Sequence, residues 1–162
     1  MKASQNILSK IFTKEKLSDQ VKQWKLHHKR IVFTNGVFDI LHPGHISSLC
    51  DAAAYGNVLI VAVNSDASVK RLKGDERPVN NEQSRALLLA SLVMTDAVVI
   101  FDESTPQQLI ASLLPDVLVK GGDYTVEQIA GAKEVMANGG EVKIVPIQEG
   151  FSTTSIINKL RS

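Results

Sequence analysis

Apolar segments alternate with helical patterns along most of this chain, and the alternation predicts its fold class. Short runs rich in β-branched residues lie at 31–34, 58–63, 97–101, 117–119 and 142–145 and are typical of buried strands. Helical periodicity or helix start signals follow them, at about 45–54, 66–73, 82–92, 105–114 and 153–160. Strands that alternate with helices predict an α/β fold with a single doubly wound (Rossmann-like) parallel sheet and helices on both faces.

Residues 1–29 precede the first strand and have a different character. They are polar and rich in lysine, with Leu17, Val21 and Trp24 spaced as on one face of a helix. Thr13 and Ser18 are the candidate N-caps of that helix. We therefore divide the chain into an N-terminal helical extension, 1–29, and a domain at 30–162 that holds the sheet.

The loop between the first strand and the next helix is the most informative segment. After the break at Asn35-Gly36, two histidines, His42 and His45, flank Gly44 where the helix begins. A helix start carries unpaired N–H groups and partial positive charge, so it attracts anions. Imidazoles donate hydrogen bonds to phosphate oxygens, and glycine lets a ligand approach the backbone closely. This combination predicts a phosphate-binding loop.

Spacing alone leaves two other interpretations of this histidine pair open. The histidines could be metal ligands, although no Cys, Glu or third His nearby completes a zinc set. They could also be ordinary loop residues. Neither the glycine-rich dinucleotide fingerprint nor the P-loop pattern fits this segment.

Composition narrows the class of protein. With 162 residues, 44% of them hydrophobic, the chain fits one domain with a sizeable core, and its net charge of +1 disfavours nucleic-acid binding. The single cysteine, Cys50, excludes a disulfide framework, and its place beside Leu49 and Ala53 on an apolar helix face predicts that it packs in the core. No segment has the length of a membrane span or the pattern of a secretory signal, so we expect no membrane association and a cytoplasmic location.

Several separated motifs add a family resemblance. Segments 34–45, 63–66, 71–79, 118–124 and 150–154 resemble, in that order, the signatures of the cytidylyltransferase-like nucleotidyltransferases, with the ending His42-Pro43-Gly44-His45 as the hallmark. The set is most similar to the adenylyltransferases of ADP-heptose synthesis, and it covers roughly residues 30–160. The resemblance implies that 30–162 is a nucleotidyltransferase domain. It would transfer AMP from ATP to D-glycero-D-manno-heptose 1-phosphate, with Mg²⁺, and release pyrophosphate and ADP-heptose for lipopolysaccharide core or another surface glycan. It also implies a homodimer.

The resemblance gives the loop residues their chemical roles. It implies that His42 and His45 hold the nucleotide phosphates and the charge that grows on them, and that Lys73 belongs to a flexible lysine loop; Lys70 and Arg71 are alternative phosphate contacts. No side-chain nucleophile is needed, because the attacking oxygen belongs to a phosphate that is already anionic. Asp39 would orient a histidine or help hold Mg²⁺, or would be a structural turn aspartate.

Further contacts are implied around this centre. Substrate-binding roles fall on Asn64, Asp66 and Lys70, which follow the second strand of the sheet domain. Three of the ligand contacts implied below have structural alternatives. Arg85 is then a surface arginine of the 82–92 helix, residues 121–123 form a plain Gly-Gly-Asp turn, and residues 152–154 simply N-cap the last helix. The implied nucleotide-binding residues are Thr34, Asn35, Gly36, Phe38, Gly44, Arg85, Lys120, Gly121, Gly122, Asp123, Glu149, Ser152, Thr153 and Thr154.

One departure from the family pattern bears on the base. Cytidylyltransferases of this group typically carry Arg-Thr before the Glu-Gly of the last motif, whereas Ile147-Gln148 stand there in this chain. The missing arginine favours ATP over CTP. The alternatives are a cytidylyltransferase or other nucleotidyltransferase for a different sugar or polyol phosphate, and a nucleotide-binding module without turnover. A sugar-kinase domain is often fused ahead of this module, so a separate heptose kinase is expected.

Overall fold

A single all-parallel sheet organises the structure, a computed structural model that describes residues 5–148 and 150–161. Its order is β1-β4-β3-β2-β5-β6. The chain runs outward from the central β2 to one edge and then returns to build the other side, so the order switches between β2 and β5. Ligands of such sheets bind beyond the carboxyl ends of the strands at this switch. The strands are β1 (Ile11–Phe12), β2 (Ile31–Gly36), β3 (Val58–Asn64), β4 (Ala97–Phe101), β5 (Val117–Gly121) and β6 (Glu141–Val145).

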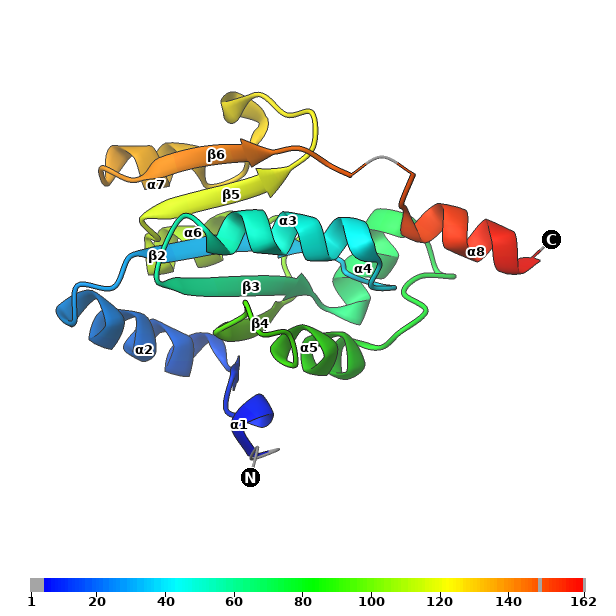
Figure 1. Cartoon of the computed structure of the whole chain (residues 1–162), viewed down its shortest axis with the longest axis horizontal. Helices are drawn as coiled ribbons and strands as arrows, with labels where there is room; N and C mark the ends of the chain where they lie inside the picture. The colour runs from blue at the N-terminus through cyan, green and yellow to red at the C-terminus, as the bar shows by residue number, and fades with distance from the viewer. Residues whose placement is uncertain (1–4, 149, 162) are drawn as a thin grey trace.

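Helices cover both faces of the sheet (Figure 1). One face packs against α2 (Lys14–Leu26), α6 (Gln107–Leu113) and α7 (Ala132–Ala137), and the other against α3 (Pro43–Ala53) and α5 (Glu82–Ala90). The short α1 (Gln5–Leu8) adds Ile7 to the second of these faces. Two further helices are α4 (Asp66–Lys73) and α8 (Thr153–Arg161), and α8 extends from the end toward which the strand arrows point. A short 3-10 turn, η1 (Val126–Gln128), precedes α7. The predicted doubly wound fold is therefore confirmed.

Two hydrophobic cores, one on each side of the sheet, hold these layers together. Successive residues of a strand point to opposite faces, so Ile31 and Phe33 enter one core while Val32 enters the other. All residues of β3 are buried, as their continuous apolar run predicts. The strands thus hold the loops at their carboxyl ends in fixed positions.

The N-terminal segment belongs to the same packing. The side chain of Thr13 caps α2 by accepting from the backbone N–H of Lys16, and Leu17 and Val21 are buried in the first core. The β1 strand, too short to show in the sequence pattern, pairs with β4. The boundary at residue 29 stays a prediction, although the segment it sets apart shares this core. None of the helices in the described part of the chain has the length and apolar character needed to cross a membrane.

The prediction that Cys50 packs in the core is wrong. The buried residues of α3 include Leu49 and Ala52, whereas Cys50 is exposed. The helix is rotated so that its buried side is centred on Leu49, and Cys50, about 100° further round, faces outward. Sequence periodicity identifies the helix here but misplaces the edge of its apolar face.

Candidate active site

A cavity of about 460 Å³ opens at the carboxyl ends of β2 and β5, where the strand order switches. It brings together sequence motifs that lie more than a hundred positions apart. The predicted residues that line it are Thr34, Asn35, Gly36, Phe38, Asp39, His42, Gly44, His45, Lys73, Lys120, Gly121, Ser152, Thr153 and Thr154. Each role assigned to them stays a prediction, but the structure places them around one space.

The two histidines form a stacked pair at the start of α3. Their ring centroids are 3.8 Å apart with an interplanar angle of 21°. Phe38 meets His45 edge-on at 5.2 Å, and Phe151 lies parallel to His42 at 6.3 Å. A Cβ at Gly44 would come within 3.1 Å of the His42 ring, so the glycine is what lets this ring lie against the helix start. Aromatic neighbours on both sides therefore fix the orientation of the imidazoles.

Both imidazoles are neutral at neutral pH. Burial lowers the pKa of His45 from 6.5 to about 4, helped by the neighbouring charge of His42 and opposed by the carbonyl of Ile40. Burial also lowers the pKa of His42. The Nδ1 atoms of both rings are buried without a hydrogen-bond partner among the described residues. Unpaired buried polar atoms are uncommon, and in a cavity wall they are ready contacts for a ligand.

The lowered pKa of His45 makes stability depend on pH. The folded state binds the proton only below about pH 4, whereas an unfolded chain binds it below about 6.5. Between these values unfolding takes up a proton, so stability falls as the pH falls, by up to about 1.4 kcal/mol per pH unit. Urea unfolding from pH 7 to pH 4 should show a steeper loss for the wild type than for His45→Gln. Parallel curves for the two proteins would contradict the buried neutral imidazole.

The start of α8 forms the opposite wall of the cavity. The Oγ of Ser152 accepts from the backbone N–H of Ser155 at 3.0 Å, an N-cap bond. Thr153 Oγ1 donates to the carbonyl of Ile40 at 3.3 Å, which ties this helix to the histidine loop. Two helix N-termini therefore border one space, and both favour an anion there.

Two lysines add positive charge to this space. Lys120, at the end of β5, has its Nζ 5.7 Å from the centroid of the Tyr124 ring, and burial lowers its pKa. Lys73 is the last residue of α4 and lines the cavity. The two other predicted phosphate contacts on this helix do not line it: Lys70 is exposed, and Arg71 pairs with Asp102. The cavity therefore offers N–H donors and ammonium groups from four separate elements.

Asp39 does not fit its predicted role as a metal ligand. Its carboxylate is almost fully buried and accepts from Arg77 Nε at 2.7 Å and from the backbone N–H groups of Val79 and Asn80 at 2.9 Å each. Burial would raise the pKa of Asp39, but the N–H groups of Asn80 and Val79 and then Arg77 outweigh it, so the net pKa is lowered. Within the described ranges, no group of three or more His, Cys, Asp or Glu is placed to hold a metal ion. The oxygens of Asp39 are already used in fixing the loop at 77–80.

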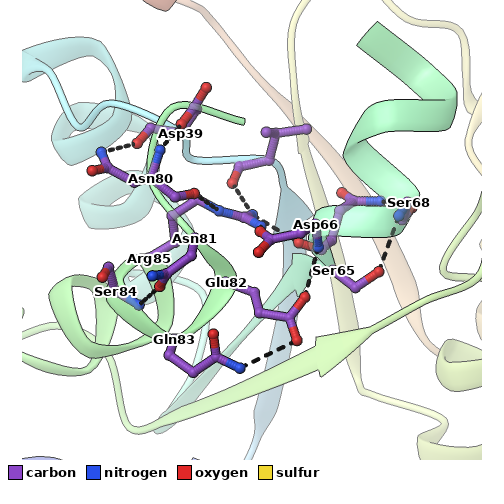
Figure 2. A network of polar contacts seen from close by, with 12 residues as sticks. Asp39, Ser65, Asp66, Ser68, Asn80, Asn81, Glu82, Gln83, Ser84 and Arg85 are labelled. Atoms are coloured by element: carbon purple, nitrogen blue, oxygen red, sulfur yellow. Dashed lines mark hydrogen bonds and ion pairs between the residues drawn. The ribbon is translucent and has the colours of Figure 1, made fainter. Parts of the chain in front are cut away.

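The prediction that Arg85 contacts nucleotide phosphates also needs correction. Arg85 is fully buried behind the cavity and donates to the carbonyls of Val37, Asn64 and Asn80 and to the carboxylate of Asp66, at 2.7–2.9 Å (Figure 2). The guanidinium thus joins the end of β3 to the loop after β2 and the loop before α5, and it does not line the cavity.

Other predicted contacts also lie outside the cavity. The side chain of Asn64 donates to Ser68 Oγ, and Asp66 pairs with Arg85, so neither reaches a ligand in this arrangement. Gly122 and Asp123 follow β5 but do not line the cavity, and Gly122 has a φ of 124°, as the alternative of a plain turn expects. Glu149 lies outside the described residues.

Some lining residues received no assignment from the sequence. They include Ser48, Arg77, Tyr124 and Phe151. Arg77 and Tyr124 lie inside the family motifs at 71–79 and 118–124, which was a usable signal. Phe151 carries the same signal, because it lies inside the motif at 150–154. Ser48 carries none, because its place in the cavity wall depends on how α3 is oriented.

This chain is similar to several known proteins. The family model of cytidylyltransferase-like proteins matches residues 33–159. The chain is 56% identical over 151 residues to the bifunctional protein HldE of Koribacter versatilis. The alignment covers 93% of this chain and 31% of that protein. The HldE protein of Haemophilus influenzae is also 56% identical, with 93% and 32% covered. The chain thus spans about a third of the length of these relatives.

Solved structures give a similar result. The lipopolysaccharide core biosynthesis protein from Thermoplasma volcanium is 32% identical, with a TM-score of 0.59, and the alignment covers 74% of this chain and 97% of that one. Pantoate-beta-alanine ligase from Francisella tularensis, in complex with beta-gamma ATP and beta-alanine, has a TM-score of 0.60, and the alignment covers 94% of this chain and 79% of that one. Its identity of 16% supports a likeness of fold alone.

Proposed function

Because this chain belongs to the cytidylyltransferase-like family, we propose that it transfers AMP from ATP to D-glycero-D-manno-heptose 1-phosphate and releases pyrophosphate. One observation carries the proposal. Two stacked, neutral imidazoles at the start of α3 border the same cavity as the start of α8 and the lysines Lys73 and Lys120. This is a site for a highly charged anion, and a nucleoside triphosphate meeting a sugar phosphate is such a ligand.

The chemistry requires alignment and charge stabilisation more than a protein nucleophile. An oxygen of the sugar phosphate attacks the α-phosphorus of ATP, and the bond from that phosphorus to the bridging oxygen breaks as pyrophosphate leaves. Negative charge grows on the oxygens in between, where N–H groups of His42 and His45 and the lysine ammonium groups donate. Neutral imidazoles suit this role, because they can gain positive character as the charge develops.

The choice of ATP is supported by one side chain in the cavity wall. Ile147 lines the cavity at the position where cytidylyltransferases of the family typically carry arginine. An apolar side chain offers a packing surface for a purine and no donor for the carbonyl of cytosine. The heptose and its use in a surface glycan are supported by the similarity to HldE and to a protein of lipopolysaccharide core biosynthesis.

The metal, the assembly and the location belong to the same proposal. Asp39 is the only carboxylate that lines the cavity among the described residues, and its oxygens are occupied. We therefore propose that Mg²⁺ arrives bound to the phosphates of ATP rather than in a protein cage, as Mg²⁺ often does. A cytoplasmic homodimer is proposed on family resemblance.

Pyrophosphate release tests the function directly. With Mg²⁺ and heptose 1-phosphate, we expect turnover with ATP and at least tenfold less with CTP or GTP, which corresponds to about 1.4 kcal/mol of discrimination. Preference for CTP would retain a nucleotidyltransferase but contradict the adenylyl product. Binding of ATP without pyrophosphate release from this or any other sugar or polyol phosphate would favour a regulatory nucleotide-binding module.

A further inference from the structure

We propose that Arg77 binds the pyrophosphate portion of ATP and that Asp39 positions it for this task. The inference rests on the proposed function and adds to it a contact for the leaving group. Arg77 lies between α4 and α5 and lines the main cavity. It also lines a smaller neighbouring cavity of about 270 Å³, which lies between the 73–79 segment and α8.

The guanidinium of Arg77 is only partly used by the protein. Its Nε donates to Asp39 Oδ2 at 2.7 Å, while Nη1 and Nη2 have no hydrogen-bond partner among the described residues. The side chain is only 16% exposed, so its surroundings restrict the position of the guanidinium. A guanidinium carries five N–H donors, and its two terminal nitrogens form a fork that fits two oxygens of a phosphate.

The contrast with Arg85 shows what this arrangement means. Arg85 uses Nε, Nη1 and Nη2 on acceptors of the protein and is fully buried, as a structural arginine should be. Among the described residues, Arg77 uses Nε alone for a side-chain hydrogen bond, and the residue lines the cavity. A buried carboxylate that holds Nε leaves the terminal nitrogens free for a ligand.

Asp39 has the contacts expected of a positioning residue. Besides Arg77 it accepts from the backbone N–H groups of Val79 and Asn80, so it fixes the guanidinium and the backbone just after it. The amide of Asn80 in turn donates to the carbonyl of Asp39 at 2.7 Å. The loop that carries Arg77 is therefore attached to the histidine loop by four donors at one residue, Asp39.

The neighbours of Arg77 identify the part of the ligand that it meets. Lys73 and Thr154 line both cavities together with Arg77. Thr154 belongs to the first turn of α8, so ammonium, guanidinium and helix N-terminus gather on one side. The β- and γ-phosphates carry most of the charge of ATP, and they become the pyrophosphate when the bond to the α-phosphorus breaks. When that bond breaks, the bridging oxygen keeps the electron pair and gains negative charge. Hydrogen bonds from Arg77 would stabilise this charge, and no proton transfer is needed.

Kinetics of Arg77→Gln test this assignment, with inorganic pyrophosphate as a product inhibitor. We expect its inhibition constant and the KM for ATP to rise about 10- to 100-fold, the effect of losing charge-assisted hydrogen bonds. The KM for heptose 1-phosphate should stay within about twofold of wild type, since that range is negligible in free energy. Arg30→Gln is the matched control: Arg30 pairs with Glu141 at the surface and lines neither cavity, so its variant should behave as wild type.

The positioning role of Asp39 is tested by combining its variant with Arg77→Gln. Asp39→Asn should weaken pyrophosphate inhibition in the same direction, and adding it to Arg77→Gln should cause little further loss, because Asp39 acts through Arg77. Independent, additive losses would overturn the positioning role. A folded Arg77→Gln with unchanged pyrophosphate inhibition, or with only the KM for the sugar phosphate raised, would overturn the main assignment.

Two further measurements keep the outcomes distinct. If Arg77→Gln does not fold, Arg77→Lys decides: it keeps the charge but lacks the fork, so an unchanged inhibition constant would refute the proposal. If the wild type shows no turnover, the proposed function fails, and calorimetric binding of pyrophosphate to wild type and Arg77→Gln then tests Arg77 alone. Equal affinities would refute its role, and a 10-fold or greater loss would support it.

Discussion

His45→Ala is expected to lower kcat/KM for ATP by about 10²–10³-fold, the usual effect of removing one preorganised donor from a site of developing charge. His45 stacks on His42, lines the cavity and has a buried Nδ1 without a partner. The fold should suffer far less, with a loss of about 1 kcal/mol typical of a single substitution. Among the described residues, the carbonyl of Ile40 is the one acceptor that loses a partner with the imidazole. Initial rates of pyrophosphate release and urea unfolding separate the two effects.

The control for this variant is His27→Ala. His27 lies at the C-terminal end of α2, exposed and outside the cavity, and its loss should change neither rate nor substrate affinity. If His45→Ala turned over at a near-normal rate, the histidine pair would lose its assigned role. If both variants were slowed alike, the effect would not belong to the site.

The fold was predictable because its signals are local. The apolar run of β3 and the amphipathic pattern of α2 each follow from residues close in sequence, and each was confirmed. Two residues of β1 carry too little pattern to be recognised, and this strand exists because β4 offers it an edge. The exposed Cys50 shows the same limit, since a helix reveals its apolar side only to within about one residue.

The site was predictable where residue type and chemistry coincide. His42, His45, Lys73, Lys120 and Ser152 are polar groups at strand or helix ends, and the structure gathers them around one cavity. Their roles in binding stay predictions.

The roles of the two arginines could not be predicted from residue type and position. Arg77 and Arg85 are both cations in or next to the same motif, and nothing local distinguishes a ligand contact from an internal support. The distinction depends on which carbonyls and carboxylates the tertiary fold places around each guanidinium. Arg85 meets carbonyls from the end of β3 and from two loops, whereas Arg77 meets one carboxylate and an open cavity.

Arg85→Gln should therefore act first on stability, lowering the free energy of unfolding by about 3 kcal/mol. Removing one partner of a buried ion pair costs about 3–5 kcal/mol, and the lower value applies because the Asp66 side chain is 34% exposed. The carbonyls of Val37, Asn64 and Asn80 also lose their donors. Urea unfolding measures the loss, and Arg30→Gln, which breaks the exposed pair with Glu141, should show a much smaller one.

Arg85→Gln also tests whether the hydrogen bonds of Arg85 affect the reaction by fixing the cavity walls. Val37 and Asn80 flank the segments that carry Asp39 and Arg77, so releasing their carbonyls should loosen both sides of the cavity. Under conditions where Arg85→Gln is still folded, we expect kcat to fall while the inhibition constant for pyrophosphate moves less than in Arg77→Gln. An Arg85→Gln protein as stable as wild type, with pyrophosphate inhibition weakened as much as in Arg77→Gln, would instead mean that Arg85 reaches the phosphates. That result would require the loops to open when ligand binds, because in the structure the guanidinium is enclosed by the carbonyls that it holds.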